Sequence, residues 1–214
     1  MANDAAGAAS HPRSGLSVCL YCGSSNSARP AFLQAAGDFG RTLAREGVRL
    51  VYGGGGIGLM GAAAKAAHEA GGAVLGVMPD FLRRNEVVYD TVETVIVPNM
   101  HERKMRMFDE SDGFAVFPGG IGTLEEVVEL MSWRRLDLHR KPIVFLDMDG
   151  FWAPMFGLLN HLIDEKVMPA WLPDTYASVA TVAEVLPALR RLRDAADSGP
   201  GFFGYPDKSV AEKG

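Results

Sequence analysis

Short apolar segments alternate with longer helical segments along almost the whole chain, and this alternation restricts the fold more than any other feature. The short segments are near-continuous apolar runs, which is typical of strands covered by helices on both faces. The expected strands are 16–22, 48–54, 73–79, 93–98, 113–120, 142–148 and 176–180. The expected helices are 30–47, 58–71, 99–111, 122–140, 151–166 and 181–195, with a charged loop at 80–90. The alternation predicts an α/β fold: a single-domain, Rossmann-like, doubly wound parallel sheet with helices on both faces.

The domain limits follow from the two ends of the chain, which are rich in small and polar residues. With 214 residues the chain suits one domain with a sizeable core. We expect a disordered tail at 1–14, a catalytic domain at 15–196 and a flexible tail at 197–214.

Charge and composition exclude several classes of partner. The formal net charge is −5 and no basic run is present, so nucleic acid and anionic membranes are not expected partners. No apolar run is long enough for a membrane span, and the first 15 residues lack the apolar segment of a signal peptide. We therefore expect a cytoplasmic protein.

The two cysteines, Cys19 and Cys22, do not indicate a metal site, because no second pair or His cluster completes four ligands. Their spacing on a strand places them on opposite faces of the sheet. We predict two reduced thiols and no metal.

Three expected strands end in segments rich in glycine and serine. These segments are "CGSS" with Ser24, "GGGGIG" with Gly54 and Gly55, and "PGGIGT". In open α/β sheets ligands bind outside the carboxyl ends of the strands, so the three segments predict one binding site. The glycines at 53–56 let a ligand touch the backbone; the alternative is a tight turn with close helix packing. No acidic residue ends the next strand, which counts against a dinucleotide.

The segment "PGGIGT" is the stronger signal for an anion. Gly119, Gly120 and Gly122 expose backbone N–H groups where a helix begins, and Thr123 adds a hydroxyl. No lysine follows in the position that a nucleoside triphosphate requires, so a monophosphate fits better.

The acidic residues that follow have two interpretations. Thr123 and Glu126 have the spacing of a capping box, with Thr123 as N-cap and Glu126 at the third helical position. A carboxylate in the first turn also stays ionised, as a group that activates water or stabilises a cation requires.

The segment "NMHERKMRMF" predicts a helix with a buried basic side. Helical spacing places Met100, Arg103, Lys104 and Met107 on one face. If this face points inward, its cations need partners such as a ligand phosphate or Glu126. The alternative is a solvated basic face formed by the stripe that contains His101.

The segments "CLYCGSS", "VYGGGGIGLMG", "MHERK", "PGGIGTLEE" and "KPIVFLDMDGFW" together resemble the LONELY GUY family over residues 16–190. The family consists of cytokinin-activating phosphoribohydrolases, long mislabelled as lysine decarboxylases. The resemblance implies hydrolysis of the N-glycosidic bond of N6-modified adenosine 5′-monophosphates, with AMP often a substrate, and a homodimer without cofactor or metal.

The resemblance also implies roles for individual residues. It makes Arg103 and Glu126 the catalytic pair. It implies substrate contacts at Lys104, Gly119, Gly120, Gly122, Thr123, Glu125, Glu86 and Ser132. A decarboxylase would need pyridoxal phosphate on a lysine, and none stands at a strand end beside the predicted phosphate site.

Two other functions remain open at this point. Proteins of similar fold carry a nucleotide or the molybdenum cofactor without catalysis, and a generic NAD-binding module is the second alternative. The homodimer would form through the helix that begins at the phosphate site, with Trp133 and Arg134 in the patch and Arg134 or Arg135 near the partner's site.

Overall fold

The computed structural model describes residues 15–83 and 89–198. It contains one sheet of seven parallel strands in the order β4-β3-β2-β1-β5-β6-β7. The strands are β1 Ser17–Tyr21, β2 Arg49–Tyr52, β3 Val74–Pro79, β4 Glu93–Val97, β5 Gly113–Val116, β6 Ile143–Leu146 and β7 Tyr176–Val179. All seven strands lie where the apolar runs predict them, which confirms the predicted fold class.

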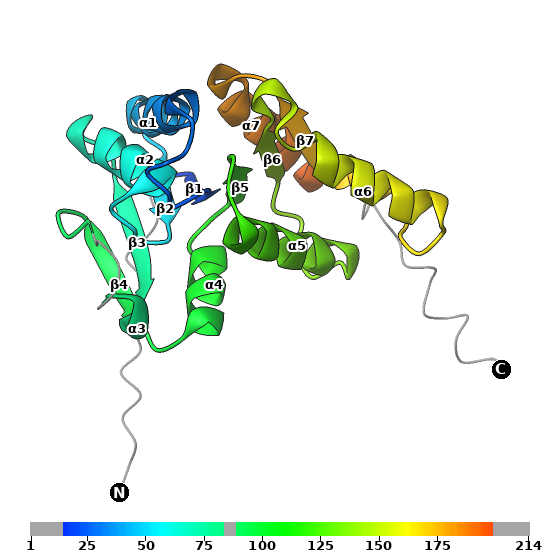
Figure 1. Cartoon of the computed structure of the whole chain (residues 1–214), viewed down its shortest axis with the longest axis horizontal. Helices are drawn as coiled ribbons and strands as arrows, with labels where there is room; N and C mark the ends of the chain where they lie inside the picture. Colours follow the sequence, from blue (N-terminus) through cyan, green and yellow to red (C-terminus); the bar gives the residue numbers. More distant parts are fainter. Residues whose placement is uncertain (1–14, 84–88, 199–214) are drawn as a thin grey trace, which may run out of the picture.

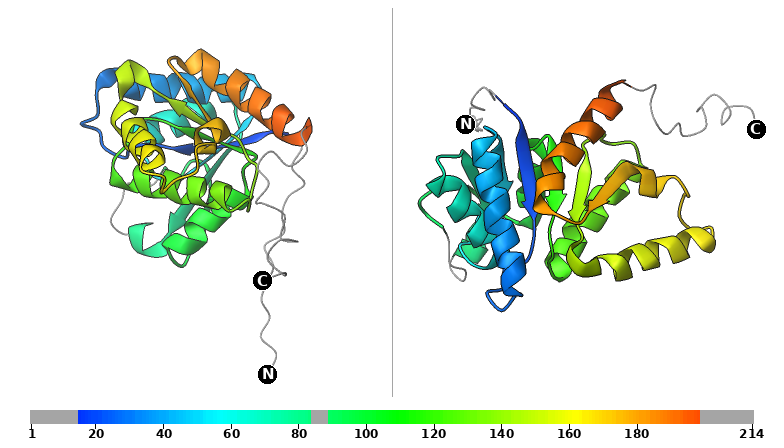
Figure 2. Two further views of the ribbon diagram at one scale, coloured as in Figure 1. Left: turned by 90° about the vertical axis from the view of Figure 1, so that its right-hand side faces the viewer. Right: turned by 90° about the horizontal axis from the view of Figure 1, so that it is seen from above.

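The α-helices are α1 Pro30–Arg45, α2 Gly58–Glu69, α3 Asp80–Arg83, α4 Met100–Asp109, α5 Ile121–Arg135, α6 Ala153–Asp164 and α7 Val182–Ser198, and two short 3-10 helices are Met148–Gly150 and Leu172–Thr175. One core cluster packs α1, α2 and α7 on one face of the sheet, and a second packs α4, α5 and α6 on the other. Figure 1 shows α1, α2 and α7 on one side of the strands and α4 and α5 on the other. The two views of Figure 2 show the same layers from other sides.

Three boundaries differ from the prediction. The segment from Asp80 to Arg83 forms one helical turn, where the sequence predicts a loop. Helix α5 begins at Ile121 and ends at Arg135, and Asp137 then adopts a positive φ of 56°. Helix α7 reaches Ser198, two residues past the expected end of the domain at 196. The remaining residues of the predicted tails lie outside the described residues.

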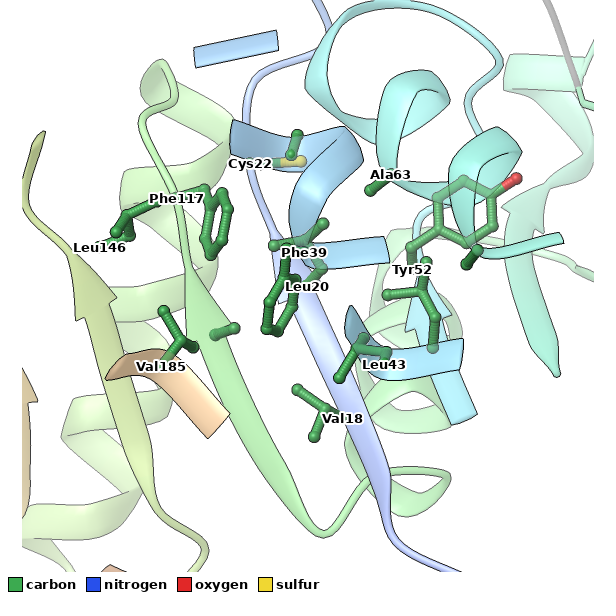
Figure 3. Close-up of a cluster of buried hydrophobic side chains, with 14 of the residues drawn as sticks. Val18, Leu20, Cys22, Phe39, Leu43, Tyr52, Ala63, Phe117, Leu146 and Val185 are labelled. Atoms are coloured by element: carbon green, nitrogen blue, oxygen red, sulfur yellow. The ribbon is translucent and has the colours of Figure 1, made fainter. Parts of the chain in front are cut away.

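The core between α1, α2 and the sheet includes the residues that directly follow β1 and β5. Phe39 of α1 lies beside Phe117, which follows β5, with ring centroids 4.9 Å apart, and both side chains are fully buried. Figure 3 shows Phe39, Leu20 and Phe117 pointing into this cluster. Cys22 belongs to this cluster and Cys19 to the opposite one, and both are free thiols, as predicted.

Among the described residues, no helix is both long and apolar enough to cross a membrane.

The contact between α1 and α2 predicts opposite effects for two glycines of α1. A Cβ at Gly40 would overlap the backbone carbonyl oxygen of Ala63, whereas a Cβ at Gly37 would lie 3.6 Å from the Arg41 guanidinium, an ordinary contact. We expect Gly40→Ala to lower the free energy of unfolding by about 1–3 kcal/mol through overpacking. Gly37→Ala should raise it by up to about 1 kcal/mol, because alanine favours the helix. Urea unfolding measures both, and a neutral Gly40→Ala would contradict the packing described here.

Candidate active site

Three strand-end loops surround one cavity of about 380 Å³ at the carboxyl edge of the sheet. This volume lies within the range of small-molecule sites, about 300–1,000 Å³. The loops follow β1, β2 and β5, which are neighbours in the sheet, and the order of the strands reverses between β1 and β5. The cavity is therefore at the topological switch point, where such sheets bind ligands. Its lining is Leu20, Cys22, Gly23, Ser24, Ser25, Gly53, Met60, Arg103, Met107, Gly120, Ile121, Gly122, Thr123 and Glu126.

The N-terminus of α5 forms one wall of the cavity. The N-cap is Gly120, which provides no side-chain cap, and the first helical hydrogen bond runs from the N–H of Leu124 to the carbonyl of Gly120 at 3.0 Å. The N–H groups of Ile121, Gly122 and Thr123 precede this bond, so the helix does not use them. The capping-box interpretation is therefore wrong: Thr123 is the third helical residue rather than the N-cap, and Glu126 is the sixth.

The N-terminus of α2, by contrast, is already occupied by the loop that follows β1. The N–H of Gly58 donates to Oδ1 of Asn26 at 2.8 Å, and the N–H of Leu59 donates to the carbonyl of Gly23 at 3.0 Å. Of these two glycine-rich helix starts, α5 is the one whose N–H groups remain for an anion.

The glycines after β2 serve packing more than the cavity. Gly54 has a φ of +81°, and a Cβ there would lie 3.2 Å from the side chain of Met78. Gly53 lines the cavity, whereas Gly54 and Gly55 do not. The close-packing alternative thus describes Gly54, and the predicted substrate contacts at Gly54 and Gly55 are not at the cavity wall.

Arg103 of α4 lies at the bottom of the cavity with 8% of its surface exposed. Its Nη2 donates to the carbonyl of Gly53 at 3.0 Å, and its Nε donates to the carbonyl of Val77 at 3.3 Å. A Cβ at Gly53 would overlap Nη2, so a larger residue there would displace the guanidinium from this position. The inward orientation of the Met100–Met107 stripe is confirmed, because Arg103 and Met107 are buried.

Glu126 of α5 faces Arg103, with 3.9 Å between Oε1 and Nη1, and 11% of its side chain is exposed. Burial raises the pKa of Glu126 from its ordinary 4.5 to about 7, although Arg103 opposes the shift. A helix N-terminus favours negative charge only within the first turn, and the carboxylate at the sixth helical position lies beyond that turn. The prediction that Glu126 sits in the first turn of the helix is therefore wrong.

Lys104 lies beside Arg103 in the sequence but does not line the cavity. Its Nζ contacts Oε1 of Glu125 at 2.5 Å and Oε2 of Glu129 at 2.9 Å, and 13% of its side chain is exposed. Burial lowers the pKa of Lys104, but the hydrogen bonds to Glu125 and Glu129 outweigh it, and the net shift is upward. Substrate contacts of Lys104 and Glu125 remain predictions from the resemblance.

The other predicted residues divide into two groups. The cavity brings together Arg103 and Glu126 with Ser24, Gly120, Gly122 and Thr123. Outside its lining are Gly119, whose missing Cβ makes room for the side chain of Thr123, and Ser132, which is exposed on α5. Glu86 lies outside the described residues.

Several lining residues were not named individually from the sequence. Gly53 lies within the predicted segment 53–56, and Cys22 and Ser25 lie within "CGSS", so the signal for them was present. Met60 carries no such signal, because an apolar residue on a helix is more often part of the core.

The raised pKa of Glu126 predicts a stability that depends on pH. Between pH 4.5 and about 7 the folded state holds a proton on Glu126 that the unfolded state has lost, so folding loses stability as pH rises through this window. We expect a loss of roughly 2–3 kcal/mol from this group alone. Glu126→Gln should abolish this pH-dependent loss of stability, and the variant should be more stable than the wild type at pH 8. Urea unfolding at pH 5 and pH 8 measures the difference, and equal pH dependence of the two proteins would refute the assignment.

Comparison with protein families and curated proteins identifies the family of the chain. The family model described as "Possible lysine decarboxylase" matches residues 60–189. A cytokinin riboside 5′-monophosphate phosphoribohydrolase of Arabidopsis thaliana is 38% identical over 181 residues, which cover 84% of this chain and 79% of that protein. Another from the same plant is 36% identical, with 80% of each chain covered. One from Oryza sativa subsp. japonica is 42% identical and covers 69% of this chain and 62% of its own length.

Solved structures show a related fold at lower identity. The molybdenum cofactor carrier protein of Chlamydomonas reinhardtii has a TM-score of 0.64 at 22% identity, covering 84% of this chain and 98% of that one. The molybdenum cofactor binding protein of Rippkaea orientalis has a TM-score of 0.63 at 21% identity, covering 83% and 96%. At 21–22% identity these matches show the fold alone. The plant relatives are 36–42% identical over most of the chain. The chain belongs to the family that is described as possible lysine decarboxylases and that includes the cytokinin riboside 5′-monophosphate phosphoribohydrolases.

Proposed function

We propose that this protein hydrolyses the N-glycosidic bond of N6-modified adenosine 5′-monophosphates, and of AMP itself, to the free base and ribose 5-phosphate. The observation that carries the proposal is the Arg103–Glu126 pair, which lies in a cavity walled by a free helix N-terminus. The plant relatives named above support the choice of substrate class.

The phosphate group of the substrate would bind at the start of α5. The N–H groups of Ile121, Gly122 and Thr123 point to the same end of the helix, where the macrodipole favours an anion. Ser24 and Ser25 from the loop after β1 line the same cavity and add hydroxyl donors. Binding energy from the phosphate then positions the sugar carbon C1′ for reaction.

Glu126 and Arg103 would act at the glycosidic bond. Hydrolysis breaks the bond between C1′ and the purine nitrogen, adds the hydroxide of water to C1′ and delivers a proton to the purine. Positive charge develops on C1′ and the ring oxygen, and the carboxylate of Glu126 stabilises this charge and takes the proton from water. Arg103 is always charged and therefore a poor proton donor, so it neutralises negative charge on the leaving group or the phosphate.

Two alternatives make different demands on the cavity. A lysine decarboxylase would need a lysine that forms a Schiff base with pyridoxal phosphate, and the lining of the cavity in the described residues contains none. A carrier of the same fold would bind a nucleotide or cofactor without turnover, and the Arg103–Glu126 pair would then have no chemical task. Incubation with AMP distinguishes the proposed hydrolase from both alternatives, because only a hydrolase releases adenine and a reducing sugar.

Replacing Glu126 tests the chemistry directly. We expect Glu126→Gln to fold normally and to lower kcat on AMP at least about a hundredfold, because the variant loses the reacting carboxylate. In the wild type, kcat should rise with pH as Glu126 loses its proton, and the residual activity of the variant should lack this limb. Glu102→Gln on α4, where Glu102 is exposed, is the matched control and should keep full activity. Full activity of the Glu126 variant would refute the proposal, and a fall in wild-type kcat as pH rises would make Glu126 a proton donor instead.

The free N–H groups of α5 predict selectivity for the monophosphate. We expect kcat/KM for AMP to exceed that for adenosine at least about a hundredfold, since adenosine cannot use the phosphate site. Inorganic phosphate and ribose 5-phosphate should compete with AMP for the cavity. Equal efficiency on adenosine and AMP would contradict this placement of the phosphate.

We also propose that the protein is a homodimer that associates through α5. Apolar residues lie on more than one side of this helix: Val127, Leu130 and Met131 face the core, whereas Val128 is 53% exposed. Leu136 and Leu138, just after the helix, are exposed as well. An isologous patch of this kind is the usual basis of a two-fold dimer.

The residues expected at this interface need one correction. Arg134 is 9% exposed and donates from Nη1 to the carbonyl of His139 at 2.8 Å, so it is bound within its own chain. Trp133 packs edge-on against Phe108, with ring centroids 5.3 Å apart. Arg135 is exposed and can still reach a partner.

Light scattering tests the association. We expect a mass twice that of the 23.0 kDa chain, and Val128→Asp should shift the equilibrium toward monomer, because a charge would be buried at the interface. Val167→Asp, at an exposed valine after α6, should leave the mass unchanged. A wild-type mass near 23.0 kDa at micromolar concentration would rule out the dimer.

A further inference from the structure

Lys104 is held by two carboxylates of the neighbouring helix. Its Nζ lies 2.5 Å from Oε1 of Glu125 and 2.9 Å from Oε2 of Glu129, and only 13% of the side chain is exposed. Glu125 and Glu129 are one helical turn apart on α5, so one ammonium group reaches both. An ammonium group has three N–H donors, and two of them are already directed at full negative charges.

The two carboxylates depend on Lys104 in turn. Like charges at this spacing on a helix repel one another, and the ammonium group between them reverses that interaction. The Lys104 side chain is 13% exposed, whereas Glu125 and Glu129 are 52% and 29% exposed, so solvent screens the contact with Glu129 less than the contact with Glu125. Drawing Lys104 toward a substrate would leave both glutamates without their cation.

Long side chains connect α4 to α5 near the cavity. Arg103 reaches Glu126, Lys104 reaches Glu125 and Glu129, and Phe108 packs on Trp133 further along both helices. Arg103 and Lys104 are consecutive residues of α4. The contacts of Lys104 with α5 therefore fix the position of the Arg103 backbone relative to α5. A misplacement of a reacting group by about 1 Å can cost a hundredfold in rate.

We propose that Lys104, Glu125 and Glu129 form a clamp that fixes α4 against α5 and holds Arg103 in place relative to Glu126. In this proposal Lys104 is a positioning residue and not a substrate contact. The inference rests on the proposed function only for its activity readout, because the clamp also affects the free protein.

The charged surroundings of Glu126 give the clamp a measurable signature. Arg103 and Lys104 approach Glu126 from α4, and Glu125 and Glu129 lie on its own helix; Cys19 and Tyr21 of β1 and Cys22 after β1 are close enough to interact with it electrostatically. Burial is the main cause of the raised pKa of Glu126; Lys104 lowers it and Glu125 and Glu129 raise it. Removing Lys104 should therefore raise the pKa of Glu126 further, and removing Glu129 should lower it.

The experiment compares Lys104→Met, Lys104→Arg and Glu129→Gln with the wild type. NMR of carbon-13-labelled free protein gives the titration midpoint of Glu126, identified by its loss in Glu126→Gln. Inorganic phosphate is the probe for binding at α5, and AMP is the probe for kcat and KM. Arg106→Met is the matched control. Arg106 is a cation of the same helix, but its partner Glu110 is the C-cap of α4 and not a residue of α5.

The clamp predicts a specific combination of results. Lys104→Met should raise the midpoint of Glu126 by about 0.3–1 pH unit, and Glu129→Gln should move it in the opposite direction. Lys104→Met should lower kcat on AMP about tenfold or more, with KM and the Kd of phosphate within about threefold. Lys104→Arg should restore most of kcat, and Arg106→Met should change none of these quantities.

Two results would overturn the clamp. If Lys104→Met weakens phosphate binding about tenfold or more and leaves the midpoint of Glu126 and kcat unchanged, Lys104 is a phosphate contact. If Lys104→Met fails to fold, an unchanged midpoint and kcat in Glu129→Gln would equally reject the clamp. Should AMP prove not to be a substrate, the proposed function fails while the titration and phosphate binding still decide the role of Lys104.

Discussion

The burial of one guanidinium group determines how the site is built. Arg103 cannot lose its charge, so a position with 8% exposure requires acceptors on several sides. The carbonyls of Gly53 and Val77 supply two of them, and both carbonyls belong to the carboxyl edge of the sheet, at β2 and β3. A residue larger than glycine at position 53 would displace this guanidinium, and the two bonds anchor α4 over the side of the sheet opposite α1 and α2.

The topology then brings the opposing carboxylate to the same place. From β1 to β4 the chain builds the sheet in one direction, and α4 returns it to β5 on the other side of β1. Helix α5 follows β5, so Glu126 approaches Arg103 from across the end of β1. The same reversal separates two helix starts that look alike in sequence. The loop after β1 uses the first N–H groups of α2 through Asn26 and Gly23, and it leaves those of α5 for a ligand.

The features that the sequence predicted are those that local pattern determines. Apolar runs located all seven strands, the glycine-rich strand ends located the cavity, and helical spacing placed Arg103 inward. The errors come from choices that local pattern leaves open. Thr123 has the spacing of an N-cap, but the N-cap of α5 is Gly120, three residues earlier, which provides no capping side chain. The partners of Lys104 and the loop that occupies α2 are likewise contacts between segments far apart in sequence.

The balance of charge around the cavity explains why one of three neighbouring carboxylates differs from the others. Glu125, Glu126 and Glu129 face two cations, and Lys104 is taken by Glu125 and Glu129. Arg103 divides its donors between two carbonyls and a 3.9 Å contact with Glu126, which is too long for a strong hydrogen bond. Of the three, Glu126 thus has the least compensation and the deepest burial, and its pKa rises to about 7 for that reason. A group poised near neutrality exchanges a proton with water at little cost, which is the property that a hydrolytic base requires. In the proposed function the glycine-rich loops bind the phosphate, and the uneven division of two cations among three carboxylates is what distinguishes Glu126 as the base.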